Sequence, residues 1–174
     1  MKKIVYLILY GVLLAFGLGL MLIVIGIRIN TSNSIPKGIY LLKRGHQLKD
    51  HYIIFCPEPK PVFNEARLRG YIDYGLCAHR FGYLMKKVVA VHGDQISSTL
   101  SGVFINGQLL PFSKPKIQDG LNRPLSLWLI KQYQLKSDEV FTMTDQSETS
   151  FDGRYYGPIH TSQIKGIVIP MITW

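Results

Sequence analysis

Ser34 lies in a short block that could present a reactive hydroxyl group, since residues 32–40 read SNSIPKGIY. A proline and a glycine two and four positions after the serine hold the backbone in a tight, irregular path, which can bring a hydroxyl and a backbone N–H together. Such a pair suits acyl transfer, with the hydroxyl as nucleophile. Ser-x-Pro-x-Gly is also an ordinary turn, so this block alone does not identify a site.

Two lysines, Lys86 and Lys87, interrupt the apolar run of residues 84–94, LMKKVVAVHGD, which is typical of a strand buried on both faces. Successive strand residues point to opposite faces, so at least one amine is expected to lie against the core, where desolvation lowers its pKa. Such a lysine can act as a general base. The alternative is an edge strand from which the lysines reach solvent, and the pattern alone does not choose between them.

A third polar block, residues 150–158, reads SFDGRYYGP. Asp152 and Arg154 fall on one face of an extended chain and could form a charge-assisted pair. The alternative is a loop with a surface ion pair worth less than ~1 kcal/mol.

His92 and Asp94 offer a different arrangement, a Ser-His-Asp triad with Ser34. The two residues are only two positions apart, so a structural role for His92 is favoured. The only Cys/His pair at a short spacing, Cys77 and His79, is a weak metal motif, and we expect neither a metal nor an organic cofactor.

Two cysteines, Cys56 and Cys77, are far enough apart in the sequence to close a loop of about twenty residues. In an oxidising compartment such a bridge could stabilise the domain by ~3 kcal/mol. Two buried free thiols are the alternative.

An apolar segment precedes these blocks, since residues 4–27 contain no charge and no proline. A helix of that length, at about 1.5 Å per residue, spans a ~30 Å hydrocarbon core. A cleavable secretory signal normally has an apolar region of about 7 to 15 residues and a small-x-small site, whereas Arg28 follows this run directly. We therefore expect a transmembrane anchor. Ser34 then lies close to the membrane surface, because seven extended residues reach at most about 25 Å.

Basic residues flank this segment on both sides, so the positive-inside rule decides little about orientation. The net charge of +9 favours contact with anionic lipid headgroups. The basic residues are scattered without a continuous run or a nucleic-acid motif, so we expect a lipid bilayer as partner and no nucleic acid.

After the anchor, frequent Gly and Pro residues and short apolar runs favour a mainly β domain. Asn106-Gly107 between two apolar runs predicts a type I′ hairpin. Long connections are expected at 57–75 and 112–126, and residues 127–133 fit either a short helix or a strand. We expect the chain to divide into two parts: residues 1–28 form a cytoplasmic stub with the anchor, and residues 29–174 form one β domain. The expected strands are 39–42, 52–55, 84–91, 103–105 paired with 108–110, 140–144 and 166–170.

The order and spacing of the three blocks resemble type I signal peptidases, specifically the TraF-like branch of conjugative transfer signal peptidases, over nearly the whole chain. The resemblance implies a compact signal-peptidase-like β domain with Ser34 as nucleophile and Lys86 as general base. It further implies that Ser150 hydrogen-bonds the lysine, that Asp152 and Arg154 brace the site, and that Ser32 helps the Ser34 N–H to stabilise the oxyanion. The paired cysteines are also similar to those of this branch.

The sequence departs from the family pattern at three positions. Lys87 stands where relatives usually have Arg, His92 where they often have Pro, and Gly153 where they often have Ser. None of these changes removes a group that the chemistry requires. Lys87 is expected to be the charged partner of a carboxylate, with Asp152 as the candidate.

The resemblance implies a membrane-anchored serine endopeptidase that cleaves a protein precursor after a small residue. The expected substrate is a conjugative pilin precursor, and the expected location is the inner membrane, crossed once, with the catalytic domain in the periplasm or outside. A general secretory signal peptidase is the nearest alternative. A non-catalytic membrane-anchored assembly module is a second, and a self-cleaving repressor would need a DNA-binding segment where this chain has the apolar helix.

Overall fold

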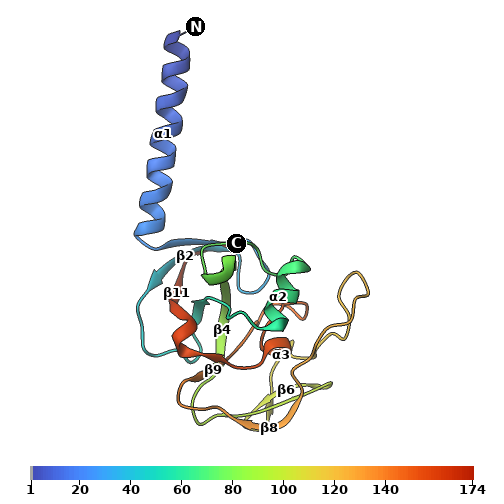
Figure 1. Cartoon of the computed structure of the whole chain (residues 1–174). Helices are drawn as coiled ribbons and strands as arrows, with labels where there is room; N and C mark the ends of the chain where they lie inside the picture. The colour runs from blue at the N-terminus through green and yellow to red at the C-terminus, as the bar shows by residue number, and fades with distance from the viewer. Residues whose placement is uncertain (1) are drawn as a thin grey trace.

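The computed structural model describes residues 2–174 and begins with one long helix, α1 (Lys2–Val24). None of its residues is buried by the rest of the chain. The helix is long and apolar enough to cross a membrane, and it extends away from the domain that follows (Figure 1). The C-terminus lies on the side of this domain where α1 ends.

A connection of only two residues joins α1 to the first strand, β1 (Ile27–Asn30). The second of these residues, Gly26, accepts a hydrogen bond from the backbone N–H of Leu42 at 2.8 Å. Gly26 has a φ of 94°, and a Cβ atom there would lie 3.0 Å from the Leu42 carbonyl oxygen, so a side chain would be strained. The end of the helix is therefore held directly against the sheet.

The domain consists of two antiparallel sheets, as expected for a mainly β fold. The larger sheet has seven strands in the order β1-β2-β11-β3-β4-β9-β10. Its other strands are β2 (Gly38–Lys43), β3 (Tyr52–Phe55), β4 (Leu84–Ala90), β9 (Glu139–Met143), β10 (Ile159–His160) and β11 (Ile164–Thr173). The strand that carries both lysines, β4, is an inner strand between β3 and β9.

The smaller sheet has four strands in the order β7-β6-β5-β8. They are β5 (Gln95–Thr99), β6 (Gly102–Ile105), β7 (Gln108–Leu109) and β8 (Ile130–Gln134). The hairpin between β6 and β7 turns at Asn106 and Gly107, whose φ angles are 51° and 84°, so the predicted hairpin is confirmed. The ambiguous segment at 127–133 contributes to β8, a strand.

The connection expected at 57–75 contains a helix, so that prediction was wrong in part. Helix α2 (Pro61–Leu68) starts with proline at its first turn, where the missing N–H is tolerated. It buries Phe63 and Ala66 in a core cluster with Phe55 and Tyr156. Three further short elements complete the chain: η1 (Ala78–Arg80), α3 (Gly153–Tyr156) and η2 (Thr161–Gln163).

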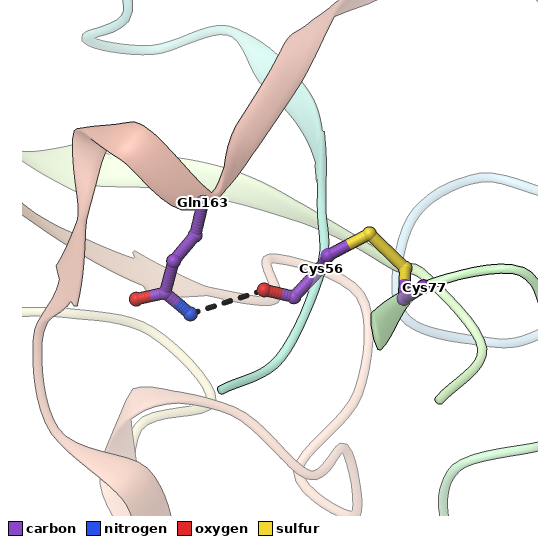
Figure 2. Close-up of a disulfide and its surroundings, with 3 residues drawn as sticks. All are labelled: Cys56, Cys77 and Gln163. Atoms are coloured by element: carbon purple, nitrogen blue, oxygen red, sulfur yellow. Dashed lines mark hydrogen bonds between the residues drawn. A yellow bond between two sulfur atoms is a disulfide. The ribbon is translucent and has the colours of Figure 1, made fainter. Parts of the chain in front are cut away.

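A disulfide joins Cys56, just after β3, to Cys77, just before η1 (Figure 2). The Cys56 carbonyl accepts a hydrogen bond from Gln163 Nε2 at 3.1 Å, and the Cys56 N–H donates to the Gln163 carbonyl at 3.0 Å. The bridge therefore ties the segment that contains α2 to the larger sheet.

The disulfide yields a prediction about stability. Replacing both Cys56 and Cys77 by serine should lower the free energy of unfolding by about 3 kcal/mol, because the bridge closes a loop whose ends are 21 residues apart. Thermal unfolding of the double variant and the native protein measures this difference. Native protein should yield no free thiol until it is both unfolded and reduced, and two alkylatable thiols under denaturing, non-reducing conditions would contradict the bridge.

Candidate active site

Three side chains from distant parts of the chain meet at one point. Lys86 Nζ lies 2.5 Å from Ser34 Oγ and 2.6 Å from Ser150 Oγ, and the two hydroxyl oxygens are 3.2 Å apart. Ser34 lies in the turn between β1 and β2, Lys86 on β4, and Ser150 just before α3. Three of the residues singled out in the sequence are therefore within mutual hydrogen-bond reach.

Lys86 is buried, with 2% of its surface exposed. Burial lowers the pKa of its amine to about 8; the attraction of Asp152 opposes this shift and the repulsion of Arg154 adds to it. At pH 7 about one molecule in ten then carries a neutral amine, whose lone pair can accept the Ser34 proton. The same amine also donates a hydrogen bond to Ser150 Oγ, and this bond fixes the direction in which the amine points. This geometry suits nucleophilic catalysis by a serine.

Lys87 has a different environment, and the prediction that it pairs with Asp152 was wrong. Its side chain is 29% exposed and pairs with Asp145 at 3.1 Å, not with Asp152. Lys87 and Lys86 point to opposite faces of β4, and both oxygens of Asp152 are already bound by Arg154, each at 2.8 Å. Tyr52 donates a longer hydrogen bond to Asp145 at 3.3 Å.

Asp152 and Arg154 form an ion pair that is completely buried, not a surface pair in a loop. Asp152 also caps α3 by accepting a hydrogen bond from the Arg154 backbone N–H at 3.2 Å. The Arg154 guanidinium donates to the Ser150 carbonyl at 3.0 Å, so it fixes the backbone next to the serine that contacts Lys86. It also donates to the backbone carbonyls of Phe112, Lys114 and Glu148 at 2.9, 3.2 and 2.9 Å.

Asn30, the last residue of β1, is a site residue that the sequence analysis missed. It is buried, and its Nδ2 donates to the carbonyls of Ser32, Ile35 and Pro36 at 2.9, 2.9 and 3.1 Å. These bonds hold the turn that carries Ser34. The only local signal was an asparagine next to a turn, which is too common to single out.

Ser32 contacts the nucleophile turn in an unexpected way. Its hydroxyl donates to Asn30 Oδ1 at 2.8 Å, because an amide oxygen can only accept. The Ser34 N–H lies 3.4 Å from Ser32 Oγ, a long contact. Stabilising an oxyanion therefore requires the Ser32 hydroxyl to turn away from Asn30, which also frees the Ser34 N–H.

The Ser-His-Asp alternative finds no support in the geometry. Asp94 is bound by Lys49 Nζ at 2.8 Å and by Asn106 Nδ2 at 2.8 Å, and His92 Nδ1 lies 3.3 Å from the Leu135 carbonyl. Within residues 2–174, no group of three or more His, Cys, Asp or Glu side chains could hold a metal ion.

A cleft of about 380 Å³ opens beside Ser34 and Ser150. Ser34 and Ser150 are part of its lining, and the long connection after β7 contributes a further part. The other lining residues are Asn33, Tyr71, Lys116, Gln118, Asp119, Gly120, Leu125, Ser147, Thr149, Phe151 and Tyr155.

Comparison with known proteins identifies the family to which the chain is similar. The family described as signal peptidase, peptidase S26, matches residues 1–174. A plasmid transfer protein TraF of Escherichia coli is 46% identical over 149 residues, which cover 86% of this chain and 84% of the relative. A probable conjugal transfer protein TraF of Sinorhizobium fredii is 32% identical over 155 residues, which cover 86% and 78%. The corresponding Agrobacterium tumefaciens protein is 32% identical, with 86% and 84% covered.

The role of Asn30 can be tested by substitution. Asn30→Ala should lower kcat on a peptide substrate by about 10- to 100-fold with little change in KM, because a misplaced nucleophile slows the chemical step more than binding. Asn30→Asp should not restore the rate, since a carboxylate cannot donate to the three carbonyls. The exposed neighbour variant Thr31→Ala is the control. An Asn30→Ala protein with unchanged kcat would remove Asn30 from the positioning role.

The lowered pKa of Lys86 gives a prediction about pH. Protonated lysine has no lone pair, so activity should be lost as the pH falls through the pKa and regained as it rises. For a peptide without ionisable groups, kcat/KM should increase about tenfold for each unit of pH below pH 8 and should level off above pH 8. A rate that is flat from pH 6 to 9 would exclude an amine of this pKa as the base.

Proposed function

The chain belongs to the signal peptidase family, peptidase S26, and from this membership we propose that it is a membrane-anchored serine endopeptidase acting through Ser34 and Lys86. One observation carries the proposal: a buried lysine amine lies 2.5 Å from a serine hydroxyl. Neither residue would be effective alone, because an ordinary serine is a weak nucleophile and an exposed lysine is protonated.

The first half of the reaction forms an acyl-enzyme. Neutral Lys86 takes the Ser34 proton as Ser34 Oγ attacks the carbonyl carbon of the cleaved bond. The negative charge that develops on the carbonyl oxygen is met by the Ser34 N–H and the Ser32 hydroxyl, once the latter has turned from Asn30. The Lys86 ammonium then gives its proton to the leaving amine, and the peptide bond breaks.

The second half releases the product. Lys86, neutral again, takes a proton from water as the water oxygen attacks the acyl carbon. Collapse of the second intermediate returns the proton to Ser34 and frees the carboxylic acid. Ser150 keeps one Lys86 N–H occupied throughout, so that the amine lone pair stays directed at the reacting atoms.

The names of the relatives bear on the substrate. Proteins described as plasmid transfer and conjugal transfer proteins share up to 46% identity with this chain. A precursor of the conjugation apparatus, specifically a pilin precursor cleaved after a small residue, is therefore the proposed substrate.

We propose that the protein attaches to the membrane through α1 and through a neighbouring surface of the β domain. The C-terminal half of β11 pairs with β2, which pairs with β1 directly after α1. Four exposed apolar side chains lie on these strands and at the chain end: Ile29, Met171, Ile172 and Trp174. Tryptophan is favoured at membrane–water interfaces. The catalytic domain thus rests at the bilayer surface, on the side where precursors are exported.

The two lysines provide a matched test of the mechanism. The full-length protein, in detergent, is incubated with the pilin precursor of its own transfer system, and products are identified by mass. Ser34→Ala should lower cleavage by at least about a thousandfold. Lys86→Arg should be equally inactive, because a guanidinium stays protonated at any usable pH.

Lys87→Arg is the control, since arginine keeps the charge that pairs with Asp145. It should retain activity within about threefold. Equal thermal unfolding temperatures exclude misfolding as the cause of any loss. Turnover by Lys86→Arg together with an inactive Lys87→Arg would reverse the assignment of the base.

A further inference from the structure

We infer that the cleft beside Ser34 is a second recognition pocket, which takes a large uncharged side chain of the substrate. The inference rests on the proposed peptidase function and identifies a specificity element of the same site. The occupant is an aliphatic or aromatic side chain at a position other than the small residue before the cleaved bond.

The size of the cleft is the first argument. Its volume of about 380 Å³ falls in the range of ~300–1,000 Å³ that is usual for ligand pockets. The methyl group of an alanine would fill only a small part of this space. The recognition of one small residue therefore does not account for the cleft.

Three aromatic residues of the cleft lining pack against one another and against the core. Phe151 and Tyr155 stack with their ring centroids 5.8 Å apart, and Tyr71 lies 6.0 Å from Phe151. Phe151 in turn packs against Tyr156 and Phe63 of the core, at 5.3 and 6.1 Å. Such a surface favours contact with apolar or aromatic groups, and its rings cannot move away without disturbing the core.

The outer wall is a hairpin arm, defined as residues 116–125, which closes on itself through a bridge between Gln118 and Pro124. The arm is fixed to the body at several points. The Tyr71 hydroxyl donates to Asp119, Arg69 donates to the Pro124 carbonyl at 2.7 Å, and the Lys116 N–H donates to the Tyr155 hydroxyl at 3.1 Å. A wall that is already in place adds little ordering cost when a ligand binds.

The charges in the lining are paired, which argues against a charged occupant. Lys116 pairs with Glu148 at 2.8 Å, and Asp119 pairs with Arg123 at 2.6 Å. Lys116 and Asp119 are the only formally charged residues among the described lining residues. The remaining polar groups of the lining are amides and hydroxyls. Such groups can bond the backbone of a peptide while the side chain enters the apolar part.

Gly120 offers a direct test, because it lines the cleft and a Cβ added to it would meet nothing within 4 Å. Gly120→Trp in the full-length protein adds a large side chain at the cleft lining without a clash at its Cβ, and we expect this side chain to compete with the substrate for the cleft. The matched control is Leu121→Trp, on the same arm but 72% exposed and outside the lining. The substrates are quenched fluorescent peptides with alanine before the cleaved bond and Ala, Leu, Phe, Lys or Glu at each flanking position in turn.

For the wild type, Leu or Phe should exceed Ala, Lys and Glu at one flanking position by about 10- to 100-fold in kcat/KM, as expected for burying a large apolar side chain. Gly120→Trp should reduce this preference below about threefold. Leu121→Trp should keep the wild-type preference. Cleavage without any preference for a large residue, or an unchanged preference in Gly120→Trp, would overturn the pocket and leave the peptidase function intact.

A binding readout separates the two proposals. In the Ser34→Ala protein, peptides carrying a benzophenone side chain at each flanking position are photo-crosslinked, and the attachment sites are mapped by mass spectrometry. One position should crosslink to the hairpin arm or to Tyr155, and Gly120→Trp should abolish that product. Crosslinking there without any cleavage by the wild type would refute the peptidase function and support the pocket. Absence of a crosslink in the cleft would refute the pocket.

Discussion

Removing one amine from water is the constraint on which the site depends. The proposed role of Lys86 as a base requires its burial on an inner strand, between β3 and β9. A shift of its pKa from 10.5 to about 8 corresponds to about 3 kcal/mol. Below pH 8 the folded protein carries this cost, and it disappears as the pH rises from 8 to 10.5, where only the unfolded lysine is still protonated. The fold thus gives up stability at neutral pH to obtain a base.

The ion pair of Asp152 and Arg154 supports both the backbone of Ser150 and the segment that leads to the cleft lining. Its guanidinium binds the backbone beside Ser150 and also the chain that leads into the hairpin arm. A disturbance of the pair would reach Ser150 and the cleft together, so the effects of mutations in the two places are not expected to be independent. Because the pair is fully buried, removing one partner would leave an uncompensated charge in the core.

The parts of the structure that could be predicted from the sequence are those with a local signal. Apolar runs between Gly and Pro residues located most strands of the larger sheet, and Asn106-Gly107 located a hairpin. The parts that could not be predicted depend on contacts between segments that are distant in the sequence. The partner of Lys87 is 58 residues away, and α2 is only 8 residues long within a segment rich in breakers. The hairpin arm is held in place by contacts with Arg69, Tyr71 and Tyr155, which lie far from it in the sequence. The choice of Lys86 over Lys87 came from the family resemblance, since both faces of their strand are apolar.

If α1 spans a bilayer as proposed, the two-residue connection between α1 and β1 determines how the domain meets its substrate. With Gly26 bonded to Leu42, the domain has no flexible tether on which to sample the surrounding volume. Encounters then depend on lateral diffusion within a plane, and the height of Ser34 above the lipid is set by the sheet itself. A precursor whose cleavable bond lies at that height is presented at a high effective concentration. With such an anchor, a bond much closer to or farther from the membrane would be out of reach, so distance from the bilayer would select substrates alongside their sequence.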